Sequence, residues 1–502
     1  MLAVGHDRYL GIDLGTSGLK VALVDPDGGI VGESEAEYAV DSPRPGWAET
    51  DPSAWVDAMR SALAALAPVL RRGRVGGVGV TGQMHGTVLC DGAGRALRPA
   101  VLWPDRRAED EVALWRKLPK PLRARLANPL VPGMTGPTLR WLLDHEPAAA
   151  RAEVVLLPKD HLRHGLAGPP VTDRTDASAT LLWDVVADTW SADTLEATGL
   201  PPWLLPRVVG CDDVVGETDV LTEWGGPRGV PVVAGCADTP AAMLAAGARQ
   251  PGARQPGARQ PGARQPGARE AGAREADVVQ VNLGTGAQVL RAVERAVPRA
   301  DPPVHLYADA DRGWYAMAAV RNAGLALEWV RRIFGADWPE LFAIAAGASP
   351  GSGGVSFLPF LTGERGGIAG PDSRGAWIGM STRTSRDDLI RAAVEAMAFC
   401  VRRAVELLDA RGRRVRLTGG GGRDHGVQRL LADVLGVPVT RVDVRSASAT
   451  GAAMLAARGV GGRLETAPRL GPEISPAPAE ALDDAYRTWL SRLPHPALFP
   501  SI

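Results

Sequence analysis

The sequence predicts an α/β protein of two lobes. Its 502 residues exceed what one ordinary core accommodates, and stretches with strand and helix patterns alternate along it. The segment from Gly11 to Lys20 also has a partial echo at 280–288, roughly half a chain away. In each copy, apolar residues lead into a Gly-Thr turn and resume after it, as in a β-hairpin. Two such turns indicate two related lobes, and the alternative is two unrelated glycine-rich hairpins.

The first lobe begins with a strand meander and continues with alternating helix and strand patterns. Apolar periodicity and glycine turns predict strands at 9–14, 19–24 and 30–37. Residues 51–70 then have the apolar spacing of a helix, and residues 75–80 read as another strand. This order predicts a mixed sheet with helices packed against it.

The second lobe repeats the theme after the hairpin at 280–290. Helices are predicted near 321–334, 386–409, 426–436 and 447–458, with a strand at 415–417. We assign residues 1–235 to an N-terminal lobe, 236–480 to a C-terminal lobe and 481–502 to a C-terminal tail.

A five-residue repeat, Gly-Ala-Arg-Gln-Pro, interrupts the second lobe at 247–275. It has no large apolar side chain to bury, and its regular prolines block both helix and strand pairing. We therefore predict a disordered insertion in a surface loop. Its arginines could attract anions, but a solvated product of repeat slippage is the reading we favour.

Composition excludes several classes of protein. A formal net charge of −1 gives no field that favours nucleic acid or an anionic membrane. The cysteines, at 90, 211, 236 and 400, form no Cys-x-x-Cys pair, which argues against structural zinc and for a reducing setting. The first residues lack the pattern of a signal peptide, and no apolar stretch approaches the ~20 residues of a membrane span. We expect a cytoplasmic protein with no nucleic-acid or membrane partner.

The two Gly-Thr turns are candidates for binding phosphate. Such turns expose backbone N–H groups, and Thr16, Ser17 and Thr285 add hydroxyl donors. Asp13 precedes the first turn, where the second copy has Asn282. A carboxylate beside a phosphate turn suits a hydrated Mg²⁺, which prefers hard oxygen ligands.

A run of four glycines, 419–422, follows the predicted strand at 415–417. Glycine there lets the backbone approach a flat ligand such as adenine or ribose. The spacing fits neither the Walker A loop nor the Rossmann fingerprint, so a P-loop NTPase is excluded.

Asp238 is the strongest candidate for catalysis. It follows the apolar run at 230–235 and precedes the helical run at 241–246. This places a carboxylate at the C-terminal end of a strand, where open α/β sheets collect ligands. There it could take the proton of a hydroxyl that attacks a γ-phosphate. A helix N-cap is the alternative.

Two segments suit a polyol. His85, between Gly82 and Gly86, could donate to a sugar hydroxyl, and a satisfied structural histidine is the alternative. Trp103 and Asp105 precede two arginines, and such mixtures hold polyols through ring faces and charged hydrogen bonds. A surface turn with an ion pair is the alternative there.

Taken together, these segments resemble the FGGY carbohydrate kinases, and most closely their xylulokinase branch. The resemblance runs from residue 9 to about residue 458. It rests on the motifs at 11–20, 82–86, 102–107, 157–160, 172–177, 282–285, 357–365 and 418–423, and on the family signature formed by 375–380 and 388–395.

The resemblance implies two actin-like (ribonuclease-H-like) lobes with ATP and sugar in a central cleft. It implies transfer of the γ-phosphoryl group from Mg-ATP to the terminal hydroxyl of D-xylulose, and homodimers are common in the family. Carried onto this sequence, Asp238 is the base and Asp13 positions Mg²⁺ and phosphate. The other implied contacts are Met84, His85, Trp103 and Asp105 for the ketose, Gly284 and Thr285 for phosphates, and Gly419, Gly420 and Gly421 for the nucleotide.

Three departures from the family pattern keep other sugars open. Thr239 stands where the family has Asn, residues 366–368 replace a Thr-Pro-His stretch, and Thr138 stands where the family has Lys. A kinase for ribulose or another polyol is therefore the competing reading. A non-catalytic sugar sensor is a third, against which the presence of both Asp13 and Asp238 argues.

Overall fold

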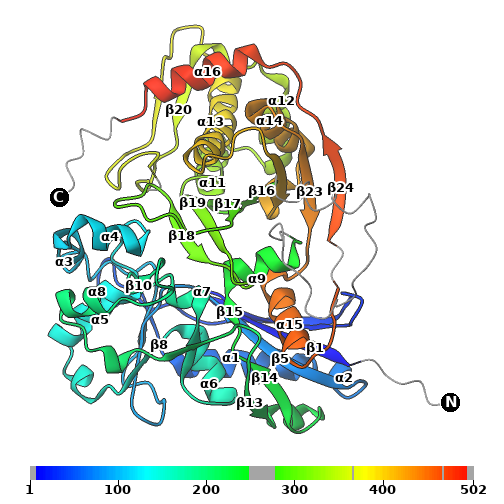
Figure 1. Cartoon of the computed structure of the whole chain (residues 1–502). Coiled ribbons are helices and arrows are strands. Elements are labelled where there is room, and N and C mark those ends of the chain that lie inside the picture. The colour runs from blue at the N-terminus through cyan, green and yellow to red at the C-terminus, as the bar shows by residue number, and fades with distance from the viewer. Residues whose placement is uncertain (1–6, 248–277, 365–366, 466–467, 495–502) are drawn as a thin grey trace, which may run out of the picture.

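The computed structural model describes residues 7–247, 278–364, 367–465 and 468–494, and it has two lobes (Figure 1). Each lobe is built around a seven-stranded mixed sheet, as the sequence predicts. The predicted insertion at 247–275 lies outside the described residues beyond Gly247. The predicted lobe boundary at 235/236 stays a prediction.

The first sheet has the order β13-β14-β5-β1-β2-β3, with β15 also paired to β5. β1 is antiparallel to β2 and parallel to β5, so the predicted meander is confirmed. The strands are β1 (Arg8–Leu14), β2 (Gly18–Val24), β3 (Ile30–Glu37), β5 (Val75–Gly82), β13 (Val214–Thr218), β14 (Val230–Val233) and β15 (Cys236–Ala237). The helices from this part of the chain are α1 (Pro52–Ala65), α2 (Ala67–Leu70), α3 (Val112–Lys117), α4 (Lys120–Leu126), α5 (Thr135–His145), α6 (Pro158–Leu166), α7 (Arg174–Ala177), α8 (Ala192–Thr198) and α9 (Asp238–Ala245).

The second sheet has the order β18-β19-β17-β16-β22-β23-β24. Its strands are β16 (Val278–Leu283), β17 (Ala287–Val293), β18 (His305–Ala308), β19 (Trp314–Val320), β22 (Arg414–Thr418), β23 (Val439–Asp443) and β24 (Arg469–Ile474). The helices after β19 are α11 (Gly324–Phe334), α12 (Trp338–Gly347), α13 (Arg386–Leu407), α14 (His425–Leu435), α15 (Ala447–Gly459) and α16 (Glu480–Ser491). The predicted helices and the strand at 415–417 are thereby confirmed.

Small two-stranded sheets complete the described chain. They pair β4 (Glu49–Thr50) with β7 (Ala100–Val101), β6 (Val88–Cys90) with β8 (Val154–Leu156), β9 (Val171–Asp173) with β12 (Arg207–Val209), β10 (Trp183–Asp184) with β11 (Thr189–Trp190), and β20 (Ser356–Leu358) with β21 (Ala376–Ile378). In the part of the chain that is described, no helix has the length and apolar character to cross a membrane.

The echo between the two hairpins is a structural repeat. β16 is antiparallel to β17 and parallel to β22, just as β1 is antiparallel to β2 and parallel to β5. Asp13 sits opposite Lys20 and Thr81, and Asn282 sits opposite Gln288 and Thr418. Asp13 and Asn282 therefore occupy equivalent positions in the two sheets.

Helix α15 comes from the C-terminal part of the chain but lies on the first sheet, against β1 and β5. A Cβ added at Gly11 would lie 1.7 Å from the Ala449 oxygen, and one at Gly79 would lie 2.0 Å from the Ala452 oxygen. Only glycine lets helix and sheet backbones approach this closely. α15 is also packed against α9, so the two lobes are joined by more than the chain crossing between them.

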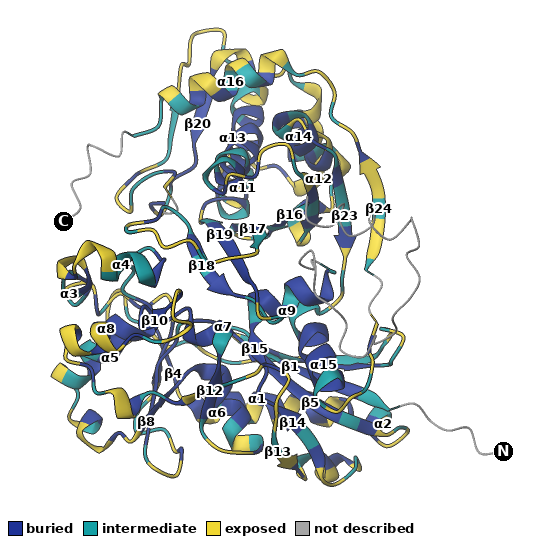
Figure 2. Ribbon diagram, in the orientation of Figure 1, coloured by how far each residue is buried: buried dark blue, intermediate teal, exposed yellow. Residues whose placement is uncertain are grey.

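The second lobe's core surrounds the long helix α13, which begins with a capping box between Ser385 and Asp388. Figure 2 shows α13 and α15 largely buried. The residues expected to form a tail instead include α16. Its Leu482, Tyr486 and Trp489 repeat at helical spacing and belong to this core, with Trp489 fully buried.

Candidate active site

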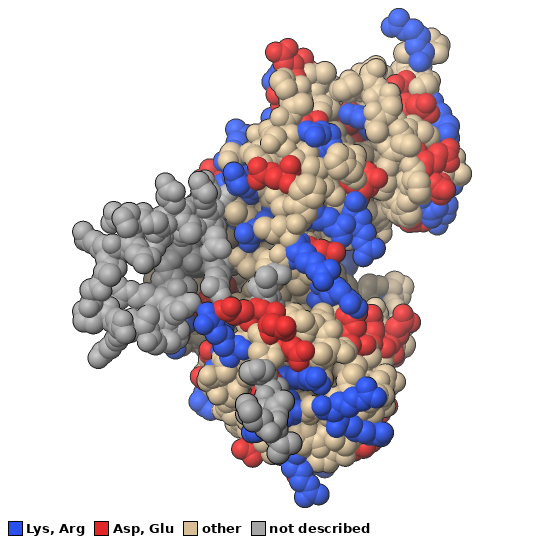
Figure 3. All heavy atoms as spheres, turned by 90° about the vertical axis from the view of Figure 1, so that its right-hand side faces the viewer, with Lys and Arg blue, Asp and Glu red and all other residues tan. Residues whose placement is uncertain are grey.

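A cavity of about 330 Å³ lies between the two sheets. It is lined by β1, β2 and α9 on one side and by the second hairpin, the glycine run and the start of α15 on the other. Its polar and glycine residues include Asp13, Lys20, Thr239, Gln280, Asn282, Gln288, Thr418, Gly419, Gly420, Arg423, Arg441, Asp443, Ser446 and Ser448. Figure 3 shows the molecule narrowing where the lobes meet, with Lys and Arg side chains beside the junction. This basic lining suits a polyphosphate.

Asp13 stands at the end of β1, half-buried, and faces this cavity. Burial raises its pKa to about 7, with a further contribution from the negative charge of Asp238, while Lys20 acts in the opposite direction. The charge of Asp238 therefore acts on Asp13 although the two residues are far apart in sequence, and Thr239, next to Asp238, lines the same cavity as Asp13. The phosphotransfer hypothesis depends on this juxtaposition.

Asp238 is the first residue of α9, and Ala237 is the N-cap, so the N-cap reading of Asp238 is wrong. Its carboxylate accepts from the backbone N–H of Thr239 at 2.6 Å and from the Thr239 hydroxyl at 3.2 Å. Burial raises the pKa of Asp238 to about 6, and the Thr239 hydrogen bonds partly offset this. At neutral pH the group is mostly ionised and can accept a proton.

A sharp turn before β15 leads the chain into α9, whose Thr239 lines the cavity. Gly235 has a φ of +81°, and a Cβ there would lie 1.8 Å from the Val80 oxygen of β5. Only glycine combines this left-handed conformation with so close an approach. β15 then pairs with the end of β5, and α9 begins at once.

The first phosphate turn is held from three directions. The Gly15 oxygen accepts from the Tyr38 hydroxyl and from the Gln83 amide at 3.1 Å. The Thr16 hydroxyl accepts from the Trp103 ring N–H at 2.9 Å. Ser17 is exposed at the tip. Trp103, predicted at the sugar, is thus tied to the turn predicted at the phosphates.

The second turn and the glycine run meet at the end of β16. Thr285 is exposed, and its oxygen and that of Gly284 accept from the first N–H groups of α11 at 2.8 and 3.2 Å. Gly419 and Gly420 line the cavity. Gly421 does not line the cavity, and a Cβ there would lie 2.9 Å from the Leu283 side chain, so it serves close packing.

Met84 and His85 lie just beyond β5 and are covered by the other lobe. The His85 Nδ1 lies 2.6 Å from the Ala179 carbonyl, which can only accept, so this nitrogen carries the proton. The His85 Nε2 is 3.5 Å from the Tyr307 hydroxyl, and the Tyr315 hydroxyl is 3.9 Å from the Met84 sulfur. Sequence reasoning missed both tyrosines, whose signal is the aromatic-rich pair β18 and β19.

Asp105 is buried in an ion pair. It accepts from Arg107 at 2.8 and 3.0 Å and from the Ala48 backbone N–H at 2.6 Å. The ion-pair reading therefore describes its contacts, although the pair is in the interior, with Asp105 2% exposed, and not at the surface. A direct sugar contact for Asp105 stays a prediction.

The cavity brings together Asp13, Gly419 and Gly420 among the predicted site residues, with Thr239 adjoining Asp238. The other predicted residues lie outside its lining: Thr16, Ser17, Met84, His85, Trp103, Asp105, Asp238, Gly284, Thr285 and Gly421. The residues that sequence reasoning missed are Lys20, Gln280, Gln288, Arg423, Arg441 and Ser446. Lys20, Gln280, Gln288 and Arg423 lay in segments already singled out, at 11–20, 280–288 and 418–423.

The donor set fits Mg²⁺. Asp13 offers carboxylate oxygens to the cavity, and burial, with a further contribution from the charge of Asp238, raises its pKa. A hard divalent cation satisfies such oxygen ligands while keeping several waters. Asp13 is the residue that would hold it.

The raised pKa of Asp13 predicts that Asp13→Asn stabilises the metal-free fold. The folded protein binds this proton more tightly than the unfolded chain, whose value is the ordinary 3.8, so ionised Asp13 lowers stability increasingly as pH rises toward about 7. We expect the variant to gain about 1–2 kcal/mol at pH 8, because the side chain is only half-buried, and less at pH 5. Urea unfolding with chelator measures this, and equal stability at both pH values would contradict it.

Comparison with known proteins decides the family. The N-terminal domain of the FGGY family of carbohydrate kinases matches residues 8–245, and its C-terminal domain matches residues 279–460. The chain belongs to the FGGY family of carbohydrate kinases. It is therefore an ATP-dependent sugar kinase, with ATP and a small-molecule sugar as its substrates.

Relatives of this FGGY kinase carry more than one substrate name. It is 32% identical to the xylulose kinase of Escherichia coli over 90% of this chain and 89% of that protein. It is 31% identical to the glycerol kinase of Alkalilimnicola ehrlichii over 90% of each chain. A crystal structure of a "xyloylose kinase" from Brucella ovis matches with a TM-score of 0.86 and 32% identity, covering 98% of this chain and 99% of that one. The two-lobed α/β prediction is confirmed.

Proposed function

We propose that this FGGY kinase is a xylulokinase, which phosphorylates D-xylulose to D-xylulose 5-phosphate with Mg-ATP in xylose catabolism. The observation that carries the proposal is that the charge of Asp238 acts on Asp13, which lines a basic cavity between the lobes, while Thr239, next to Asp238, lines the same cavity. The xylulose kinases among its relatives and the Met84–His85 pair, which Tyr315 of the other lobe covers, support the choice of sugar. A cytoplasmic location and a homodimer belong to the same proposal.

In the proposed reaction, the terminal hydroxyl of the ketose attacks the γ-phosphorus in line with the departing ADP oxygen. Asp238 accepts the hydroxyl proton as the new O–P bond forms, and ADP leaves with the electron pair of the broken bond. The Thr239 hydrogen bonds hold the Asp238 carboxylate in one orientation. Mg²⁺, when bound, neutralises charge on the β- and γ-phosphates.

Several groups favour the polyphosphate electrostatically. Lys20, Arg423 and Arg441 line the cavity, and α15 begins there with Ala447 and Ser448. A helix N-terminus carries partial positive charge and unpaired N–H groups. The phosphate turns add backbone donors from both lobes. These donors are placed before reaction, so they stabilise the transferring charge without reorganisation.

The sugar would lie where the second lobe covers Met84 and His85. The proton on the His85 Nδ1 is held by the Ala179 carbonyl, so Nε2 of the neutral ring can only accept, from the Tyr307 hydroxyl or from a sugar hydroxyl. Tyr307 and Tyr315 approach from β18 and β19 and limit access by water. Exclusion of water matters because an open site would hydrolyse ATP.

The raised pKa values of Asp238 and Asp13 predict that activity falls toward acid pH. Because protonated Asp238 cannot accept the hydroxyl proton, kcat/KM for the sugar should decline as pH drops through about 6 to 7. Initial rates at saturating Mg-ATP across pH 5 to 8 measure it. Asp57→Asn, which changes an exposed carboxyl on α1, should leave this fall of activity in place. A flat profile down to pH 5 would remove Asp238 from the base role.

A substrate panel tests the proposed function. ADP release with Mg-ATP should be fastest with D-xylulose among D-xylulose, D-ribulose, ribitol, glycerol and gluconate. Higher kcat/KM for glycerol or ribulose would replace the sugar while keeping the kinase. ADP release with no member of the panel would favour the sensor reading.

A further inference from the structure

A charged cluster is buried behind the Asp238 segment, away from the cavity lining. Lys159 in α6 is fully buried, with its Nζ 2.7 Å from Asp173 and 3.3 Å from Asp176, and it also pairs with Asp160. Asp173 ends β9, and Asp176 belongs to α7. Three separate elements are therefore tied together at one ammonium group.

The three carboxylates are close enough to hold a metal ion, but Lys159 already supplies the cation. Burial alone would lower the pKa of Lys159, and the attraction of Asp160, Asp173 and Asp176 raises it well above its ordinary value. The ammonium stays charged, and the cluster is a fixed anchor instead of a cation site.

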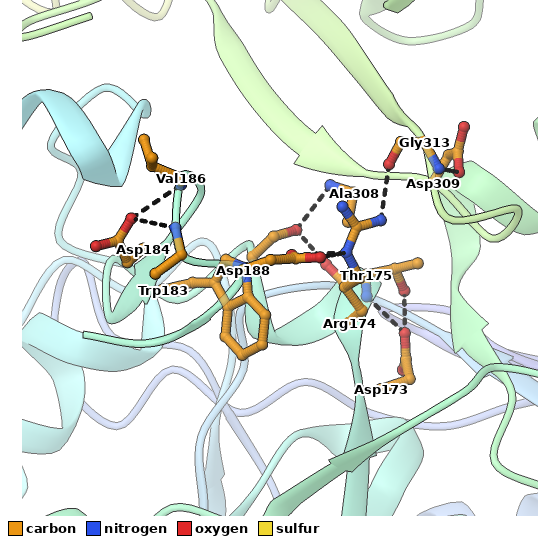
Figure 4. A network of polar contacts seen from close by, with 12 residues as sticks. Asp173, Arg174, Thr175, Trp183, Asp184, Val186, Asp188, Ala308, Asp309 and Gly313 are labelled. Atoms are coloured by element: carbon orange, nitrogen blue, oxygen red, sulfur yellow. Dashed lines mark hydrogen bonds and ion pairs between the residues drawn. The ribbon is translucent and has the colours of Figure 1, made fainter. Parts of the chain in front are cut away.

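A chain of hydrogen bonds connects this charged cluster to the residue before Asp238. Asp173 accepts from the Thr175 backbone N–H at 2.7 Å and from the Thr175 hydroxyl (Figure 4). Because the Thr175 hydroxyl donates its hydrogen bond to Asp173, a lone pair on the same oxygen accepts from the Ala237 N–H at 2.8 Å. Ala237 is the N-cap of α9, and the next residue is Asp238.

The hydrogen bond between Ala237 and Thr175 lies where the pairing of β15 with β5 ends. Cys236 and Ala237 pair with Thr81 and Gly82 of β5, and the register ends there. The Ala237 N–H is therefore among the last backbone groups held before the carboxylate. Displacing this point by a fraction of an ångström would move Asp238 relative to the attacking hydroxyl.

We propose that Thr175, anchored through Asp173 to Lys159, is a positioning residue that sets the place of the Asp238 carboxylate. The proposal rests on the proposed function, because it takes Asp238 as the base. Thr175 is fully buried and lies outside the cavity lining, so we expect it to act on the rate of transfer and to leave the binding of ATP and sugar unchanged.

The test is Thr175→Val, which replaces the hydroxyl by a methyl of similar size, assayed with the best acceptor from the panel. We expect kcat to fall about 10- to 100-fold, while KM for sugar and for ATP stays within about twofold, as for a misplaced catalytic group. Thr175→Ser keeps the hydroxyl and should recover most of the rate.

Thr172→Val is the matched control. Thr172 is also fully buried in this segment, and its hydroxyl has no hydrogen-bond partner among the described residues. Its loss should leave kcat unchanged. Equal losses of kcat in both valine variants would assign the effect to general packing and overturn the proposal.

Assays in the Asp238→Ala background distinguish the positioning role of Thr175 from the base role of Asp238. If Thr175 acts through Asp238, adding Thr175→Val to Asp238→Ala should lower the residual rate no further. An additional loss there, or a Thr175→Val enzyme with the parent kcat, would overturn the positioning role. Full turnover by Asp238→Ala alone would instead overturn the proposed base.

Discussion

Asp238→Asn is expected to lower kcat for sugar phosphorylation by about 10² to 10⁴-fold, the range that a positioned general base contributes. The amide keeps the shape of the side chain but cannot take the hydroxyl proton. The carboxylate accepts two hydrogen bonds from Thr239, and an amide oxygen can still accept both, so the start of α9 should persist. ADP release with saturating sugar and Mg-ATP measures the loss.

Binding provides the control for Asp238→Asn. The cavity residues proposed to hold the nucleotide, such as Gly419, Gly420 and Arg423, are distant from Asp238 in the sequence and unchanged in the variant, so the affinity for ATP should change little. Equilibrium binding of ADP and the thermal melting curve show whether the variant is folded. A folded variant with more than about a tenth of the parent kcat would exclude Asp238 as the base.

Local sequence patterns were sufficient for most of the fold. The alternation in 9–37 and the helical spacing in 386–409 appear as β1 to β3 and as α13. These patterns are informative because each element buries one face, which imposes a period of two or of 3.6 residues on the apolar side chains. The echo of Gly11–Lys20 at 280–288 also predicted that the two lobes are related, because equivalent strands of the two sheets need the same turn.

Contacts between distant segments were not predictable from those patterns. Nothing near Asp105 indicates that the backbone N–H of Ala48 also donates to its carboxylate. Nothing near Met84 indicates that Tyr315 of the other lobe touches it. These contacts depend on how the lobes pack, which residue spacing within one element does not encode.

The candidate site was predicted unevenly for the same reason. Asp13 and Asp238 were identified because strand ends and glycine turns mark them locally. The support behind them, from Lys159 through Asp173 to Thr175, was visible only as two motifs of a family resemblance. The structure gives these motifs a physical connection to Asp238 through Ala237.

Gly79→Ala is expected to have the largest effect on stability. The added Cβ would lie 2.0 Å from the Ala452 oxygen, so α15 must move away from β5 or the strand must bend. Overpacking of a core typically costs ~1–3 kcal/mol, and here the clash is with helix backbone, which cannot turn aside as a side chain can. We expect a loss of about 3 kcal/mol or more in the free energy of unfolding, measured by urea unfolding followed by circular dichroism.

Gly165→Ala is the matched control, because an added Cβ in α6 would meet no described atom within 4 Å. It should be neutral or gain up to about 1 kcal/mol, since alanine favours a helix interior more than glycine does. If Gly79→Ala unfolds at the same urea concentration as Gly165→Ala, α15 does not lie directly on β5. The start of α15 at Ser446 and Ala447 lines the cavity beside Asp13, so that outcome would also remove the helix from the phosphate site.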